Sequence, residues 1–268
     1  MQIEIDIVDA FTSAQFGGNS AAVIITEKWL SEPLMQSIAA QNNLSETAFL
    51  LKRSDSEYHI RWFSPLTEID FCGHATLASA FVVFRKHPHL KVLDLFAEAV
   101  GEMHITHRGD GLIAMNFPSR TPQPLANIPC DLLEGLSITP REVLRNNQAY
   151  FAIYAEEEDI LQLQQDPARL ANLAPYDVVV TAQSRQYDFI SRYFWPTNGG
   201  AEDPVTGSIH TGLAPYWGEK LGRSNLIAFQ ASKRGGLLHC QLDGERVIIS
   251  GNAVPYLSGV IDVVEKDK

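Results

Sequence analysis

The sequence is poor in cysteine and lacks the spacing that a thiol-based framework needs. Its 268 residues include three cysteines, Cys72, Cys130 and Cys240. These are too few and too scattered for a disulfide framework or a Cys-x-x-Cys metal site, so we expect no resident metal ion. An odd number of thiols, with no secretion signal in the sequence, is typical of a reducing compartment, and we therefore expect a cytoplasmic protein.

Long apolar runs and an excess of basic residues are also missing. No stretch approaches the ~20 consecutive apolar residues that span a membrane. The formal net charge is -11, whereas a protein that binds nucleic acid presents a basic surface. We therefore expect neither a membrane nor a nucleic acid as partner. With 45% hydrophobic and 20% charged residues, the composition is that of an ordinary globular protein.

Two segments of the chain repeat each other, one in each half. The first runs from Arg61 to Ala80 and the second from Arg192 to Ala214. Each begins as a strand with Arg, an aromatic residue and Phe, continues through a loop marked by Pro, and reaches a Gly that opens an apolar helix. The start of a helix leaves backbone N–H groups free to bind an anion. The repeat predicts two pseudo-symmetric lobes whose helix starts face a common cleft.

The pattern of the remaining segments predicts the α+β class, in which each lobe is a curled sheet around a central helix. We expect the first lobe at residues 1–118 and the second at 119–268, with the last strand able to return to the first lobe. A proline-rich linker joins the lobes. Helices are predicted at 32–42, 74–87, near 139–146 and at 208–221; the third of these has Thr139 and Pro140 as its helix-start signal.

Two polar residues of the first half are candidates for proton transfer. Glu46 interrupts an otherwise apolar run, and a carboxylate held among apolar neighbours can work as a general acid or base. The simpler alternative is a solvated charge at a strand edge. His74 follows Gly73 at the opening of the first apolar helix, where an imidazole can donate or relay a proton. It could equally serve only as a helix cap.

Three further residues lie at the equivalent helix starts. Asp203 precedes a proline that holds it in an extended conformation and directs it toward the second helix, although Asp-Pro also initiates ordinary turns. Ser208 occupies the place of His74, but serine at a helix start is common for structural reasons. Cys72 could act as a thiolate base or simply as a small buried residue. The helix starts suit the binding of a substrate carboxylate. The acid/base groups suit the movement of a proton from one carbon of that substrate to another.

Several motifs, in order along nearly the whole chain, make the sequence similar to the PhzF-like phenazine biosynthesis family. This family shares its fold with diaminopimelate epimerase and proline racemase. The motifs are Asp9–Thr12 with Phe16–Asn19, Leu44–Phe49, Arg61–Pro65, Phe71–Thr76, Glu202–Ser208 and, more weakly, Gly251–Val254. The resemblance implies two lobes, each a strand barrel around a central helix, and a homodimer.

The resemblance also implies a function, namely cofactor-independent isomerisation of a small carboxylate-bearing substrate by proton transfer. The general acid/base of the family falls on Glu46, and its assisting catalytic groups fall on His74, Asp203 and Ser208. Its substrate-binding positions fall on Asn19, Gly73, Thr206 and Gly207.

The sequence departs from the racemase and epimerase relatives at one position. Those relatives carry a cysteine before each helix-opening glycine, whereas here Cys72 fills the first place and Thr206 the second. A threonine hydroxyl is a poor base, so a mechanism with two thiols is excluded. Two alternatives to the isomerase remain open: an amino-acid racemase or epimerase that uses Cys72, and a protein that binds small acids without turnover. The substrate itself cannot be derived from the sequence.

Overall fold

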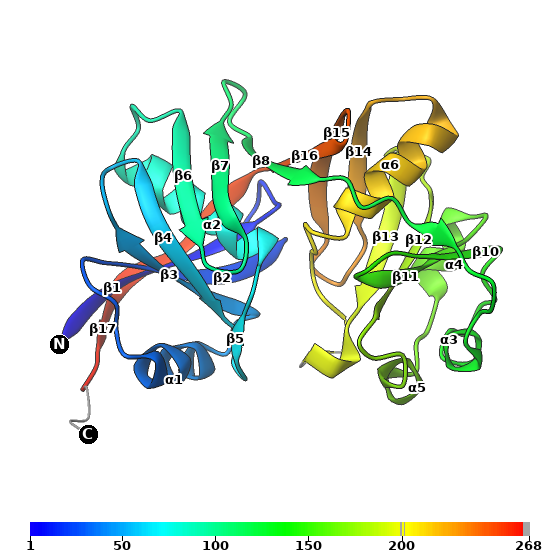
Figure 1. Ribbon diagram of the computed structural model, residues 1–268, viewed down its shortest axis with the longest axis horizontal. Coiled ribbons are helices and arrows are strands. Elements are labelled where there is room, and N and C mark those ends of the chain that lie inside the picture. The colour runs from blue at the N-terminus through cyan, green and yellow to red at the C-terminus, as the bar shows by residue number, and fades with distance from the viewer. Residues whose placement is uncertain (199, 201, 265–268) are drawn as a thin grey trace. The chain divides into compact units, whose positions relative to one another are not determined.

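The computed structural model describes residues 1–198, 200 and 202–264, and the chain forms two compact units. The first unit contains Met1–Asn116 together with the chain from Ser250 onward, and the second contains Phe117–Ile249. The chain passes from one unit to the other within strand β8 (Ile113–Pro118) and returns within β16 (Arg246–Gly251) (Figure 1). Among the helices of the described residues, none has the length and apolar character needed to cross a membrane.

The first unit is a mixed sheet that curls around one helix. Its strands lie in the order β17-β1-β2-β3-β4-β6-β7-β8, with parallel pairs β2/β3 and β4/β6 and the short β5 beside β4. The strand bounds are β1 Gln2–Ala10, β2 Asn19–Thr26, β3 Glu46–Lys52, β4 Glu57–Phe63, β5 Glu68–Ile69, β6 Val92–Ala97, β7 Gly101–His107 and β17 Ala253–Asp262.

The core of this unit is helix α2 (Gly73–Lys86), of whose 14 residues 11 are buried. A helix that is apolar on all sides is stable only when it is enclosed, and here the strands β1, β2 and β3 pack on it. Helix α1 (Glu32–Asn42) instead buries a single stripe, formed by Met35, Ile38 and Ala39. This difference fixes which helix begins inside the unit, where a buried site can form.

The second unit has the same design. Its strands lie in the order β9-β10-β11-β12-β13-β14-β15, with parallel pairs β11/β12 and β13/β14. The strand bounds are β9 Gln123–Pro124, β10 Glu142–Arg145, β11 Ala149–Ile153, β12 Asp177–Gln183, β13 Phe189–Phe194, β14 Asn225–Gln230 and β15 Gly236–Asp243. The helices are α3 Cys130–Glu134, α4 Glu157–Gln162, α5 Pro167–Ala171 and α6 His210–Leu221, with a 3₁₀ turn at Pro196–Asn198.

The sheet order shows that the internal repeat extends over most of each unit. In the first unit, β2, β3, β4, β6 and β7 pair alternately parallel and antiparallel, and β11 to β15 do the same in the second. The buried helix occupies the same place along the chain in both units: α2 follows β4 and the short β5 and precedes β6, and α6 comes between β13 and β14 (Figure 1). The predicted α+β class with two pseudo-symmetric lobes is therefore confirmed.

One predicted element is wrong, and another begins later than expected. The predicted helix near 139–146 is strand β10, Glu142–Arg145, which pairs with β11. The helix-start signal at Pro140 reflects only the local preference of the backbone. The burial of Val143 and Leu144 in a sheet stabilises the strand by more than that preference favours a helix. The second apolar helix begins at His210, because Gly207 and Ser208 lie in a tight turn with i to i+3 hydrogen bonds before it.

Candidate active site

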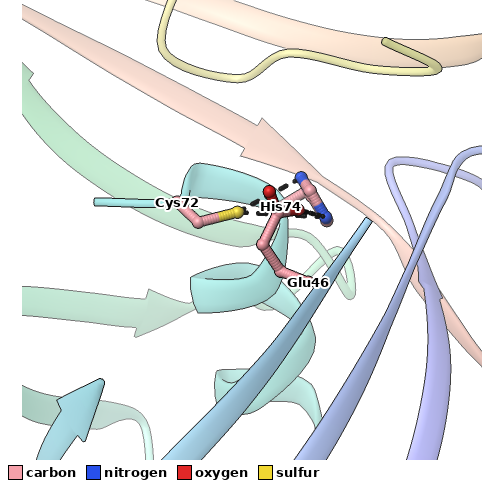
Figure 2. Close-up of side chains that lie close together, drawn as sticks. All are labelled: Glu46, Cys72 and His74. Carbon is pink, nitrogen blue, oxygen red and sulfur yellow. Dashed lines mark hydrogen bonds and ion pairs between the residues drawn. The ribbon is translucent and has the colours of Figure 1, made fainter. Parts of the chain in front are cut away.

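Glu46 and His74 form a buried pair in the first unit. Glu46 is the first residue of β3 and His74 the second residue of α2, so the packing of this helix on this strand brings the two side chains together (Figure 2). Their exposed fractions are only 2% and 4%, and His74 Nε2 lies 2.9 Å from Glu46 Oε2. The contact is not aligned as a hydrogen bond, and within the described residues Oε2 has no hydrogen-bond partner. The pair thus offers a buried carboxylate oxygen that a ligand can engage.

Two neighbours fix the orientation of the His74 ring. The Asn19 side-chain nitrogen lies 3.1 Å from His74 Nδ1, and the Cys72 sulfur lies 3.4 Å from the same atom. An amide nitrogen only donates, so Nδ1 accepts from Asn19. A neutral imidazole that accepts at Nδ1 carries its proton on Nε2, the nitrogen nearest Glu46.

The loop that leads to Asn19, the first residue of β2, is tied to the end of β1. Gly18 has a φ of +61°, and a Cβ atom there would lie 2.0 Å from the Ala10 carbonyl oxygen. The Asp9 carboxylate accepts hydrogen bonds from the backbone N–H of Phe16, at 2.9 Å, and from the hydroxyl of Ser20. Glycine is thus required for the close approach of the loop to β1, and the loop in turn places Asn19 against His74.

The N-terminus of α2 has the features of an anion site. Cys72 is its N-cap residue in an extended conformation, and within the described part of the chain no side-chain hydrogen bond caps the helix. The N–H groups of the first turn, beginning at Gly73, lack intrahelical acceptors and carry the positive end of the helix dipole. They lie beside the Glu46–His74 pair, so a carboxylate bound there would lie next to the acid/base groups.

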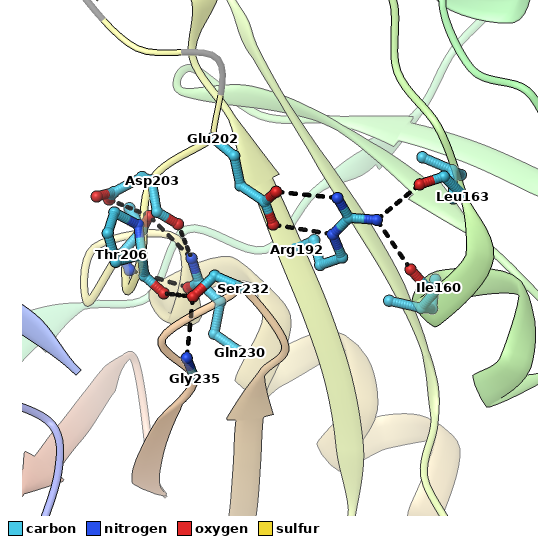
Figure 3. A network of polar contacts seen from close by, with 10 residues as sticks. Ile160, Leu163, Arg192, Glu202, Asp203, Thr206, Gln230, Ser232 and Gly235 are labelled. Atoms are coloured by element: carbon cyan, nitrogen blue, oxygen red, sulfur yellow. Dashed lines mark hydrogen bonds and ion pairs between the residues drawn. The ribbon is translucent and has the colours of Figure 1, made fainter. Parts of the chain in front are cut away.

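In the second unit, the predicted residues Asp203 and Thr206 share one rigid turn (Figure 3). The Thr206 hydroxyl donates to the Asp203 carboxylate, which is 5% exposed. The side-chain amide of Gln230, on β14, spans the turn by donating to the Asp203 carbonyl at 2.8 Å and accepting from the Thr206 N–H at 2.9 Å. Because Gln230 holds the turn at both ends and the Thr206 hydroxyl binds the carboxylate, the direction of the Asp203 side chain is fixed.

A half-buried ion pair fixes the base of this turn. Arg192, on β13, donates to the two carboxylate oxygens of Glu202 at 2.8 and 2.9 Å, and to the carbonyl oxygens of Ile160 and Leu163 at 3.2 and 2.7 Å (Figure 3). The first unit has the counterpart of this pair, because Arg61 on β4 donates from Nε to Glu68 at 2.6 Å. In each unit, the arginine of the repeat thus anchors the segment that leads to the buried helix.

Ser208 is held by a chain of polar side chains. Gln148 Nε2 donates to Ser208 Oγ at 2.8 Å and to the Tyr193 hydroxyl at 3.1 Å, and Tyr193 donates to Asp177 at 2.6 Å. Burial, with the nearby charge of Asp177, raises the pKa of Tyr193 well above its usual value, so the phenol keeps its proton. Since Ser208 Oγ accepts from Gln148, its own hydrogen is directed toward other acceptors.

The predicted site residues fall into two sets, each within its own unit. Glu46, His74, Asn19 and Gly73 lie together in the first unit, and the second set consists of Asp203, Thr206, Gly207 and Ser208. Gln148, Gln230 and the Arg192–Glu202 pair were not predicted from the sequence. Arg192 was marked by its place in the repeat, whereas nothing in the sequence connects either glutamine with the loop that it holds.

Comparison with known proteins identifies the family. The family model described as phenazine biosynthesis-like protein matches residues 8–259. A protein of Pseudomonas aeruginosa named an uncharacterized isomerase is 47% identical, over 97% of this chain and 99% of its own. A crystal structure of a PhzF-family phenazine biosynthesis protein from Enterococcus faecalis has a TM-score of 0.93 and 39% identity, and the match covers 98% of this chain and all of the other.

A protein of much lower sequence identity has a similar fold. A hydroxyproline epimerase from Agrobacterium vitis, only 11% identical, superimposes with a TM-score of 0.58 over 97% of this chain and 92% of its own. This likeness concerns the fold alone and agrees with the predicted class. Both the motifs and the match over residues 8–259 show that the chain belongs to the PhzC-PhzF family of phenazine biosynthesis-like proteins.

Proposed function

We propose that the protein is a cofactor-independent isomerase that moves a proton on a small carboxylate-bearing substrate, with Glu46 as the general acid/base. The observation that carries this proposal is the buried Glu46 carboxylate, whose Oε2 has no hydrogen-bond partner among the described residues and lies 2.9 Å from His74 Nε2. The name isomerase given to similar proteins of about the same length supports the reaction class.

The proposed reaction has two proton transfers. Glu46 removes a proton from an acidic carbon of the substrate and then returns a proton to another carbon, so that no group is lost and no electron leaves the molecule. The intermediate carries an enolate charge next to the substrate carboxylate. The N–H groups at the start of α2 stabilise that charge, and His74 holds or relays the proton beside Glu46.

The second set of residues has supporting roles in this proposal. The Ser208 hydroxyl donates a hydrogen bond to the substrate, since its oxygen already accepts one from Gln148. Asp203, held by Thr206 and Gln230, assists the second proton transfer. The turn at Gly207 contributes backbone N–H groups as a second anion site.

The decisive experiment is hydrogen–deuterium exchange in heavy water, followed by NMR across a panel of small carboxylic and amino acids. We expect the wild type and the control Glu57→Gln, altered at the exposed first residue of β4, to exchange a carbon-bound proton of at least one acid. Glu46→Gln should exchange at least ~100-fold more slowly. Near-full exchange by Glu46→Gln would exclude Glu46 as the acid/base group.

Two other functions give different results in the same experiment. The Cys72 sulfur is close enough to His74, at 3.4 Å, for a racemase or epimerase that uses this thiol. In that case Cys72→Ser would nearly abolish exchange, and deuterium would enter at a stereocentre. A non-catalytic protein would instead bind one of the acids and exchange no proton.

A further inference from the structure

Three different metal-binding side chains meet at the buried pair. The donor atoms of Glu46, Cys72 and His74 all lie within 4.8 Å of one another (Figure 2). Cys72 Sγ is 3.9 Å from His74 Nε2, which is itself 2.9 Å from Glu46 Oε2. No metal site was predicted from the sequence, because its three cysteines are few and scattered and lack the Cys-x-x-Cys spacing. The packing of β3 on α2 supplies Glu46 as the third ligand.

We propose that this cluster is a zinc-binding site with Cys72 Sγ, His74 Nε2 and Glu46 Oε2 as ligands. Zinc is bound by thiolate at about 2.3 Å, by imidazole at about 2.0 Å and by carboxylate at about 2.1 Å. An ion at those distances requires donor atoms roughly 3 to 4 Å apart, which is the range of the two separations to Nε2. Three protein ligands leave the fourth tetrahedral position open to water or a small anion.

The state of the Glu46 carboxylate is an independent indication of a cation. Glu46 is 2% exposed, and its Oε2 points toward His74 without a hydrogen-bond partner among the described residues. A buried carboxylate oxygen that lacks a partner costs free energy, which coordination to a cation would offset. Thiolate and imidazole select zinc and other transition metals over magnesium or calcium, which prefer oxygen ligands.

Metal binding requires a change of protonation at two residues. The Cys72 thiol releases its proton to solvent and becomes the thiolate ligand. His74 stays neutral by moving its proton from Nε2 to Nδ1, and the Asn19 amide turns so that its oxygen accepts from Nδ1. The ion would then occupy the lone pairs that the proposed proton transfer uses. Zinc is therefore an inhibitor of the proposed reaction and not its cofactor.

The test uses cobalt as a spectroscopic substitute for zinc in the chelator-treated full-length protein. We expect one equivalent of Co²⁺ to give the near-ultraviolet charge-transfer absorption of a thiolate–cobalt bond, and Zn²⁺ to displace it. Cys72→Ser should lose this absorption, and its zinc affinity should fall at least about tenfold. Cys240→Ser is the matched control, because Cys240 is also buried and burial raises the pKa of its thiol, which disfavours the thiolate.

Two results would overturn the proposal. One is a wild-type titration with no thiolate–cobalt absorption, which requires no variant and so does not depend on how a variant folds. The other is an absorption that survives in Cys72→Ser. Neither measurement involves a substrate, so failure of the zinc site and failure of the isomerase proposal are separate outcomes. Zinc binding could be confirmed in a protein that exchanges no proton, and the reverse also holds.

Discussion

The guanidinium of Arg192 donates two hydrogen bonds, 2.8 and 2.9 Å long, to the carboxylate of Glu202, the residue that directly precedes Asp203. The exposed fractions of the two side chains are only 16% and 24%. The planar arginine fork matches both carboxylate oxygens, and its remaining nitrogen reaches the carbonyls of Ile160 and Leu163. Arg192 thus connects the Asp203 loop to the segment around α4 through contacts that lysine cannot reproduce.

Arg192→Lys should therefore destabilise the protein. We expect the free energy of unfolding to fall by about 1 to 3 kcal/mol, since a lysine ammonium cannot satisfy the carboxylate and both carbonyls at once. Chemical denaturation measures the change. Arg185→Lys is the control, because Arg185 pairs with Glu158 at the surface, where the expected change is below about 0.5 kcal/mol. Equal effects of the two substitutions would contradict the anchoring role of Arg192.

The buried His210 should make stability depend on pH. Burial lowers the pKa of His210 from 6.5 to about 4, and within the described residues its Nε2 has no hydrogen-bond partner. Between these two values the unfolded chain binds the proton and the folded protein does not. The protonation of His210 therefore leaves the free energy of unfolding unchanged above pH 6.5. It lowers that free energy by up to about 3 kcal/mol as the pH drops toward 4.

The measurement is the free energy of unfolding at several pH values between 7 and 4. His210→Gln cannot titrate, so its stability should fall less steeply than that of the wild type over this range. His89→Gln, at an exposed position, is the control and should keep the wild-type slope. A wild-type slope in His210→Gln would show that other groups cause the acid sensitivity.

Gln148 and Ser208 should act as a unit in the proposed reaction. Gln148→Leu removes the donor that orients the Ser208 hydroxyl, and we expect proton exchange to slow by about 10- to 100-fold. Ser208→Ala should have a similar effect, and the double variant should be little slower than either single one. The control Gln186→Leu lies at an exposed position. Additive effects in the double variant would mean that the two side chains work independently.

Gly18→Ala should disturb the loop that places Asn19. A Cβ at Gly18 would lie 2.0 Å from the Ala10 carbonyl oxygen, in addition to the strain of a φ of +61°. Gly244 is the matched control, since its φ is +58° and a Cβ there meets no atom within 4 Å. We expect Gly244→Ala to cost about 1 to 2 kcal/mol of stability and Gly18→Ala clearly more, as measured by urea unfolding. Similar losses would show that the clash relaxes and only the backbone strain matters.

The sequence determined the elements that carry strong local signals. The apolar run opened by Gly73 predicted a helix enclosed by a curled sheet, and the repeated Arg-aromatic-Phe strands predicted two similar lobes. The same local reasoning failed at β10, Glu142–Arg145, because a helix-start signal says nothing about the strands that lie alongside. The order of the motifs pointed to Glu46 and His74 as candidates, but not to the 2.9 Å contact between them.

The tertiary structure alone decided which side chains meet. Glu46 and His74 are 28 positions apart in the sequence, and Gln148 and Ser208 are 60 apart, so no periodicity of the chain connects either pair. Parallel strand pairs require long connections, and the packing of a helix on such strands brings distant residues to one place. Burial then removes water as an alternative partner, so that the remaining polar contacts are set by the fold and not by the neighbours in the sequence.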